Sequence, residues 1–359
     1  MNPDSKIFAP SKVSGDQSKV SQYLRGERIY PTTIELDLTQ HCTRACSGCP
    51  YTVARRQGVS LTLDFLDRLF GILGPHTPGV VFSGGEATIA PQFPEILALA
   101  RTKGFQEIAV ISNGGHTHLP KVQDALLEHA TSIRFSLYDW QEKEMPYFDE
   151  SLRKISRLRE RIGKEGSTLE IGASILTRHD LNHRYEAVGL RALAAGIDWL
   201  YFHPYCVEWQ SKHPVQADQT GVLAAIDGLR KIAPPGANIQ VPVERYSREP
   251  LYFEKLHGSH FLIQVGADGI NYAGPECKYD KKSALLDLND YLRDDFLWHP
   301  RRLNMLDAMN SGNYDFIGTR HRPVMFSDYI QKLIRRPAAD REEALAESPA
   351  GGFSYPDIL

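Results

Sequence analysis

The segment TTIELDLTQHCTRACSGCP, residues 32–50, joins two patterns that decide how the rest of the chain is interpreted. Its first part, residues 32–39, alternates apolar and polar residues, and this alternation predicts a β-strand. Its second part places three of the five cysteines of the chain close together, at Cys42, Cys46 and Cys49. The three cysteines therefore follow directly after the first predicted strand.

Clustered cysteines in a reducing compartment indicate a metal site rather than disulfide bonds. Three thiolates cannot fill a tetrahedral site alone. One interpretation is a zinc ion with His41 or an outside group as the fourth ligand. Another is a 4Fe–4S cluster with three cysteine ligands, which leaves one iron open to a second molecule.

Strand-like and helix-like segments alternate six times after this point. The predicted strands are residues 32–39, 79–85, 107–115, 132–139, 169–176 and 198–205, and the predicted helices are 63–73, 93–104, 121–130, 150–163, 185–196 and 221–233. This alternation is typical of an α/β fold with a parallel sheet and helices outside it. A closed barrel needs eight such units, so six predict an open, partial (β/α)6 barrel or a doubly wound sheet. Both architectures bind ligands at the carboxyl ends of the strands.

The remaining parts of the chain give the expected domain organisation. Residues 1–28 are expected to form an N-terminal arm and residues 29–233 the barrel. Residues 234–335, where the alternation stops, are expected to form a C-terminal extension that covers the barrel mouth. Residues 336–359 are rich in Ala, Pro, Glu and Gly, and a loose tail is expected there.

Composition narrows the class of function. The formal net charge is −3, so no basic field supports binding to nucleic acid. The chain has no apolar run of the length that a membrane helix needs, and its polar first residues do not look like a signal peptide. A cytoplasmic location is the expectation.

The spacing Cys-x3-Cys-x2-Cys resembles the cysteine motif of the radical S-adenosylmethionine (SAM) superfamily. The segment SGGEAT, residues 83–88, is similar to the Gly-Gly-Glu element of that family. The resemblance implies that Cys42, Cys46 and Cys49 hold a 4Fe–4S cluster. It also implies that Gly84, Gly85 and Glu86 bind the amino group of SAM, whose cleavage gives a 5′-deoxyadenosyl radical. Glycines let a backbone approach a ligand closely, and a glutamate can accept a hydrogen bond from an ammonium group.

Further SAM contacts are suggested by three residues at later strand ends. Asn113 and Ser136 match positions that contact the ribose or carboxylate of SAM in the family, and Arg178 is a candidate partner of the carboxylate. Ordinary turn chemistry is the alternative for Asn113 and Ser136, and a surface position is the alternative for Arg178. The chain departs from the family pattern at Ala87, where proline is common, and at Gly48, where an aromatic residue is usual.

Two cysteines lie outside the motif. The segment around Cys277, residues 265–280, resembles a degenerate form of the SPASM-type extension that carries auxiliary clusters. Cys206 and Cys277 are too few for such a cluster, so a single cluster is expected. Either thiol is a candidate hydrogen-atom donor to a substrate radical, and a small buried apolar residue is the alternative for each.

The resulting functional hypothesis is a radical SAM enzyme that acts on a small polar metabolite, such as a sugar, nucleoside or amino acid derivative. The reaction would be an epimerisation, dehydrogenation, decarboxylation or rearrangement, with a flavodoxin or ferredoxin as electron donor. The alternatives are modification of a ribosomally made peptide and a non-enzymatic zinc or iron–sulfur module. Five residues are expected to line the substrate site: Tyr205, Glu208, Trp209, Arg245 and Tyr246.

Overall fold

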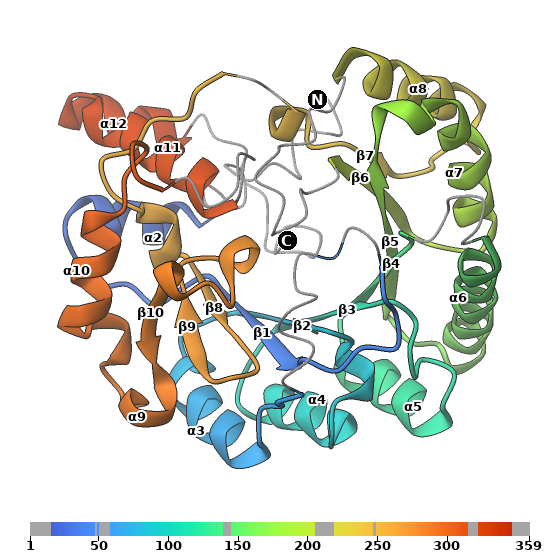
Figure 1. Cartoon of the computed structure of the whole chain (residues 1–359), viewed down its shortest axis with the longest axis horizontal. Helices are drawn as coiled ribbons and strands as arrows, with labels where there is room; N and C mark the ends of the chain where they lie inside the picture. Colours follow the sequence, from blue (N-terminus) through green and yellow to red (C-terminus); the bar gives the residue numbers. More distant parts are fainter. Residues whose placement is uncertain are drawn as a thin grey trace.

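A single ten-stranded sheet organises the chain (Figure 1). The computed structural model describes residues 16–46, 49, 58–138, 145–204, 219–246, 249–314 and 322–346. The strand order is β10-β9-β8-β1-β2-β3-β4-β5-β6-β7. Neighbours from β8 through β1 to β7 run parallel, whereas β8, β9 and β10 pair antiparallel.

The strands of the barrel lie where the sequence predicts them, apart from a few residues at their ends. They are β1 (Thr33–Thr39), β2 (Gly79–Gly84), β3 (Glu107–Ser112), β4 (Ser132–Ser136), β5 (Glu170–Thr177) and β6 (Trp199–Pro204). A short seventh strand, β7 (Ile239–Gln240), lies outside the six predicted units and pairs with β6. The six alternating units and the open sheet confirm the predicted partial barrel.

Helices cover the outer side of the curved sheet in Figure 1. They are α3 (Leu63–Leu73), α4 (Phe93–Thr102), α5 (Pro120–His129), α6 (Met145–Glu165), α7 (Tyr185–Ala194) and α8 (Gln219–Ile232). Short 3-10 turns follow β2 and β5, at η3 (Ala87–Ile89) and η5 (His179–Arg184). Each helix buries an apolar face, as in α3, where Leu66, Leu69 and Phe70 are fully buried.

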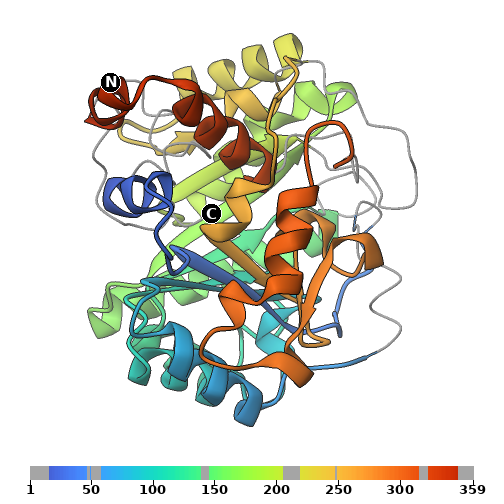
Figure 2. The ribbon, with the colours of Figure 1, turned by 90° about the vertical axis from the view of Figure 1, so that its left-hand side faces the viewer.

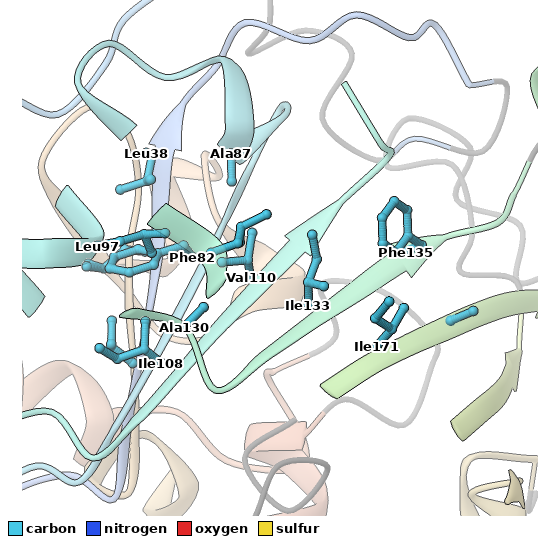
Figure 3. Close-up of a cluster of buried hydrophobic side chains, with 14 of the residues drawn as sticks. Leu38, Phe82, Ala87, Leu97, Ile108, Val110, Ala130, Ile133, Phe135 and Ile171 are labelled. Carbon is cyan, nitrogen blue, oxygen red and sulfur yellow. The ribbon is translucent and has the colours of Figure 1, made fainter. Parts of the chain in front are cut away.

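The two faces of each strand have different roles. On β1, Ile34, Leu36 and Leu38 belong to the main apolar core, which is drawn around Phe82 and other residues of the neighbouring strands in Figure 3. Successive side chains of a strand point to opposite faces, so Glu35 and Asp37 face the inside of the barrel. Both are buried, which places ionisable groups inside the fold.

The chain after α8 extends the sheet beyond β1. Strand β8 (Leu262–Val265) pairs with β1 in parallel, and β9 (Ile270–Tyr272) and β10 (Ala284–Asp287) continue from it. Figure 2 shows this region with its helices toward the viewer. The helices are α9 (Leu288–Tyr291), α10 (Pro300–Ala308) and α11 (Arg322–Arg335), and the 3-10 turns are η6 (Val243–Tyr246), η7 (His257–His260), η8 (Pro275–Cys277), η9 (Lys281–Ser283) and η10 (Phe296–Trp298).

Two helices form where the sequence predicts loose chain. Within the expected N-terminal arm, α2 (Gln17–Leu24) begins at Asp16, which caps the helix by accepting from the backbone N–H of Lys19. Within the expected tail, α12 (Ala338–Ala346) packs Leu345 into a second apolar cluster that includes Val20 of α2. The tail prediction is therefore wrong for this helix, because a tertiary contact stabilises a segment that its composition alone does not. No helix in the described part of the chain is long and apolar enough to cross a membrane.

Candidate functional site

The cysteine loop leaves the carboxyl end of β1. Cys42, Cys46 and Cys49 are all half-buried, and the backbone N–H of Cys49 donates to the carbonyl of Cys46 at 3.2 Å. Residues 47, 48 and 50–57 lie outside the described part of the chain. The loop thus lies at the edge of the sheet where parallel α/β folds bind ligands.

Two N–H groups point at the sulfur of Cys42. The side-chain amide Nδ2 of Asn113 donates to Cys42 Sγ at 3.3 Å, and the backbone N–H of Arg44 donates at 3.4 Å. Thr43 Oγ1 donates to Asn113 Oδ1 at 3.2 Å and fixes the orientation of that amide. Donors aimed at a sulfur stabilise its thiolate form, which is the form that ligates metals.

Side chains of helix α6 contact the cysteine loop. The Arg44 guanidinium lies 4.2 Å from the centre of the Tyr147 ring and 3.8 Å from Glu150. Lys154 Nζ pairs with Glu150 at 2.8 Å, and this hydrogen bond lowers the pKa of Glu150. Lys154 also donates to the carbonyl of Gly114 at 2.8 Å. The first turns of α6 therefore connect the loop after β1 to the turn after β3.

The buried carboxylate of Glu86 accepts hydrogen bonds from groups at the ends of both β2 and β3. Its Oε1 accepts from the backbone N–H of Thr88 at 3.0 Å, from Thr88 Oγ1 at 2.6 Å and from Ser112 Oγ at 2.7 Å. Its Oε2 accepts from the backbone N–H of Asn113 at 2.6 Å. A carboxylate has about four acceptor sites in all, so donors from the protein itself use most of the hydrogen-bonding capacity of Glu86. In the structure, Glu86 positions the Asn113 turn that contacts Cys42.

The glycines before Glu86 are needed for a close backbone approach. Gly84 has a φ of +129°, and a Cβ on it would lie 2.5 Å from the carbonyl oxygen of Thr39. A Cβ on Gly85 would lie 2.2 Å from the carbonyl oxygen of His41. The backbone N–H groups of Gly85 and Glu86 donate to those two carbonyls, each at 2.8 Å. The glycines thus bring the turn after β2 against the start of the cysteine loop.

The donor chemistry of this loop fits an iron–sulfur cluster, because three soft thiol ligands leave one coordination position open. Within the residues that the structure describes, no three His, Cys, Asp or Glu side chains converge as metal ligands. The assignment of Cys42, Cys46 and Cys49 as cluster ligands therefore stays a prediction. So does the binding of SAM by Gly84, Gly85 and Glu86.

Comparison with known proteins identifies the domain. Residues 36–185 match the family model described as the radical SAM superfamily. The chain contains a radical SAM domain at residues 36–185. Members of this superfamily use a 4Fe–4S cluster and SAM, as expected from the cysteine spacing.

Curated relatives match parts of the chain. The 7,8-dihydro-6-hydroxymethylpterin dimethyltransferase of Methanocaldococcus jannaschii is 34% identical over 90 residues, which is 23% of this chain and 18% of that protein. The PqqA peptide cyclase of Xanthomonas oryzae pv. oryzae is 32% identical over 118 residues, 30% of each chain. The PqqA peptide cyclase of Xanthomonas axonopodis pv. citri is 26% identical over 238 residues, 61% of this chain and 62% of that protein. The chain spans less than a third of the length of the first two relatives.

Solved radical SAM structures share the fold. SuiB of Streptococcus suis bound to S-adenosylmethionine aligns with a TM-score of 0.59 at 13% identity, over 80% of this chain and 71% of that one. The enzyme anSMEcpe with bound AdoMet and a peptide aligns with a TM-score of 0.58 at 13% identity, over 88% and 99%. The similarity extends well beyond the matched domain into the C-terminal part of the chain.

The other SAM candidates of this radical SAM chain lie at strand ends, as predicted. Ser136 is half-buried at the end of β4. Arg178 follows β5, where Tyr185 Oη donates to its carbonyl at 2.6 Å and accepts from its N–H at 2.5 Å. Their contacts with SAM stay predictions.

Of the two candidate hydrogen-atom donors, Cys206 and Cys277, the structure describes only Cys277. Cys206, Tyr205, Glu208 and Trp209 lie outside the described residues. Cys277 is 1% exposed in an apolar cluster with Phe253, Leu256 and Leu306. Its Sγ lies 3.0 Å from Tyr314 Oη, and burial raises the pKa of the thiol to about 12. These surroundings favour the buried apolar role that the sequence left open, and the donor role stays a prediction.

Sequence reasoning missed a charged cluster inside the barrel. Asp37 accepts from Lys278 Nζ at 2.6 Å, from Tyr279 Oη at 2.7 Å and from Ser83 Oγ at 2.8 Å. Glu35 pairs with Arg322 at 2.9 Å. The alternation of Glu35 and Asp37 within a strand was a signal for an inward-facing polar row, but their basic partners come from the distant C-terminal part.

Of the two predicted substrate residues on η6, Arg245 contacts this charged cluster, whereas Tyr246 contacts the end of β5. Arg245 lies 3.8 Å from Glu276, which also pairs with Arg322 at 3.2 Å. Tyr246 is buried, with its Oη 2.7 Å from Thr177 Oγ1. Tyr246 therefore joins η6 to the end of β5.

Proposed function

We propose that this protein is a radical SAM enzyme that modifies a peptide. The prediction of a small polar metabolite is wrong, because the PqqA peptide cyclases match this chain over as much as 61% of its length. That match is the observation that carries the proposal. A SuiB structure bound to its precursor peptide SuiA also aligns over 79% of the chain, with a TM-score of 0.56 and 12% identity.

The residues assigned to the cofactors come from the loop and turns described above. We propose that Cys42, Cys46 and Cys49 hold the cluster, and that six residues surround SAM: Gly84, Gly85, Glu86, Asn113, Ser136 and Arg178. When bound, these cofactors would supply a 5′-deoxyadenosyl radical that removes a hydrogen atom from the substrate. Asn113 and the backbone N–H of Arg44 would stabilise the thiolate of Cys42. Glu86 would act by positioning Asn113.

The C-terminal extension is assigned to substrate binding. We place its boundaries at residues 234–335. Arg245, Lys278 and Arg322 come from this region and reach acidic residues on its own turn η8 and on β1. Charged groups from the extension therefore form part of the barrel interior, where a substrate would meet the radical. A flavodoxin or ferredoxin in the cytoplasm would supply the electron.

The test is a peptide modification assay without oxygen. The full chain is reconstituted with iron and sulfide, reduced with dithionite and given SAM with a displayed library of random peptides. Modified peptides are detected as a mass change by tandem mass spectrometry. We expect modified peptides with the parent protein and none with Cys46→Ala.

A control separates this proposal from the rejected one. The same protein is incubated with pools of free sugars, nucleosides and amino acids. Consumption of a metabolite with no peptide modified would overturn the peptide assignment. The variant Thr102→Ala, at an exposed position at the end of α4, serves as the matched control and should keep the activity of the parent.

A further inference from the structure

Among the residues that the structure describes, one histidine inside the barrel lacks a well-formed hydrogen bond from its ring. His203, near the end of β6, is 8% exposed. Both of its ring nitrogens are buried and make no hydrogen bond of ordinary geometry to a described residue, and only a weaker backbone contact with Pro204 remains. A buried polar group without a partner destabilises the fold, so such groups usually have a functional reason.

Aromatic rings hold the imidazole in place instead. Tyr201 stacks on His203 with centroids 5.3 Å apart and planes at 29°. Tyr138 meets it edge-on, with centroids 6.1 Å apart and planes at 73°. Packing thus fixes the buried ring and leaves most of the hydrogen-bonding capacity of its nitrogens unused among the described residues.

An arginine in the same interior forms no ion pair with any acidic residue that the structure describes. Arg134 lies on β4, and its buried Nε makes no hydrogen bond among the described residues. The other inward-facing cations differ, since Lys278 pairs with Asp37 and Arg322 pairs with Glu35. No ion pair joins Arg134 to a carboxylate in the described part of the chain.

Small residues surround Arg134 in the sheet register. Gly172 on β5 lies beside it, and a Cβ there would come within 2.0 Å of the Trp199 ring. Ser136 and Ser174 pair with each other two residues further along the strands. The described residues at these register positions therefore offer hydroxyl groups and a guanidinium.

Positive charge gathers at this place. Burial lowers the pKa of His203 well below its usual value, and the charges of Arg245, Arg134 and Arg322 lower it further. The imidazole is therefore neutral at pH 7, with one N–H donor and one acceptor. Arg245 and Arg322 face Glu276 and Glu35, which leaves Arg134 as the cation that an added anion would neutralise.

We propose that Arg134 and His203 bind a carboxylate side chain of the substrate, an Asp or Glu residue of the peptide. The guanidinium would donate to the carboxylate oxygens, as arginine does in paired contacts. The His203 N–H would donate to the same group. The identity of the substrate as a peptide rests on the proposed function, whereas the anion site rests on these contacts alone.

Binding without turnover tests this site. The reconstituted full chain is titrated by calorimetry with N-acetyl-glutamate N-methylamide and with its neutral glutamine analogue. We expect the parent protein to bind the glutamate probe more tightly. The variants Arg134→Gln and His203→Asn should lose about ten- to a hundredfold of that preference, as expected for hydrogen bonds to a charged group.

Matched controls and two further ligands complete the test. Arg157→Gln makes the same change at an exposed position of α6 and should keep the preference. SAM should bind Arg134→Gln as it binds the parent, and a loss of SAM binding would show that Arg134 serves the cofactor instead. Inorganic phosphate that binds more tightly than the glutamate probe, or a preference that survives in both variants, would overturn the proposal. Carboxylate binding without any peptide turnover would support the anion site and count against the proposed function.

Discussion

At the scale of single residues, Glu86 has a role that its motif does not reveal. The spacing of the cysteines and the Gly-Gly-Glu segment predicted which residues meet after β1, β2 and β3. The hydrogen bonds of Glu86 could not be predicted, because its donors come from Thr88, Ser112 and Asn113, on two separate turns. Its carboxylate faces the protein, so its substitution should affect the fold and the cysteine loop together.

The first prediction concerns Glu86→Gln. The amide would place an NH2 group against donors, so we expect the free energy of unfolding to fall by about 2–3 kcal/mol, the range for hydrogen bonds to charged groups. Urea unfolding followed by circular dichroism measures this change. Glu95→Gln, at an exposed position of α4, should change stability by less than about 0.5 kcal/mol. Equal stability of the two variants would show that the hydrogen bonds of the Glu86 carboxylate do not stabilise the fold.

The second prediction concerns His257, which lies between α2 and α11. Its Nδ1 is 2.7 Å from Tyr23 Oη, and its Nε2 is 3.3 Å from Gln331 Oε1. Burial lowers the pKa of His257 to about 4. Because the unfolded chain binds the proton at a higher pH than the folded chain does, stability should fall as the pH falls from about 6.5 to about 4.

The measurement is a comparison of the parent with His257→Gln across this range. The parent should lose up to about 3 kcal/mol more than the variant between pH 7 and pH 4, from the size of the pKa shift. His203 also has a lowered pKa, but it is present in both proteins, so its contribution cancels. The charge of His257 helps to lower the pKa of His260, so part of the difference between the two proteins comes through His260. Parallel stability curves for the two proteins would show that His257 does not carry this dependence.

At the scale of elements, the six strands of the barrel could be predicted because each is a local apolar pattern. The pairing of β8 with β1 could not. It joins Thr33 to Leu262, and nothing in either segment specifies that partner. The buried ion pairs could not be predicted for the same reason. Asp37 and Lys278 are 241 positions apart in the chain, and only the fold brings them together.

The third prediction tests this long-range pair with a double-mutant cycle. Asp37→Asn and Lys278→Met should each lower the free energy of unfolding by about 3 kcal/mol, since each removes the nearest opposite charge of a buried group. The double variant should lose clearly less than the sum, because neither charge remains. Lys255→Met, which breaks an exposed pair with Asp307, should cost less than about 1 kcal/mol. Additive losses in the double variant would show that the two groups do not interact.

At the scale of the whole molecule, the partial barrel places the cysteine loop at one edge and the extension against β1. The sequence predicted the barrel and the loop. It predicted the wrong substrate class, because composition and strand pattern carry no information about what enters the interior. In our proposal the substrate is selected by inward-facing side chains such as Arg134 and His203, whose neighbours are set by sheet register.

The central claim is that the cysteine loop supports radical cleavage of SAM. The most direct test is 5′-deoxyadenosine formation, measured by mass spectrometry, from the reconstituted and reduced protein with SAM. We expect 5′-deoxyadenosine from the parent protein and none from Cys46→Ala. The parent should also contain iron and sulfide near four per chain, as a 4Fe–4S cluster requires. An intact four-iron cluster that forms no 5′-deoxyadenosine even with peptides present, or one bound zinc in place of iron, would contradict the central claim.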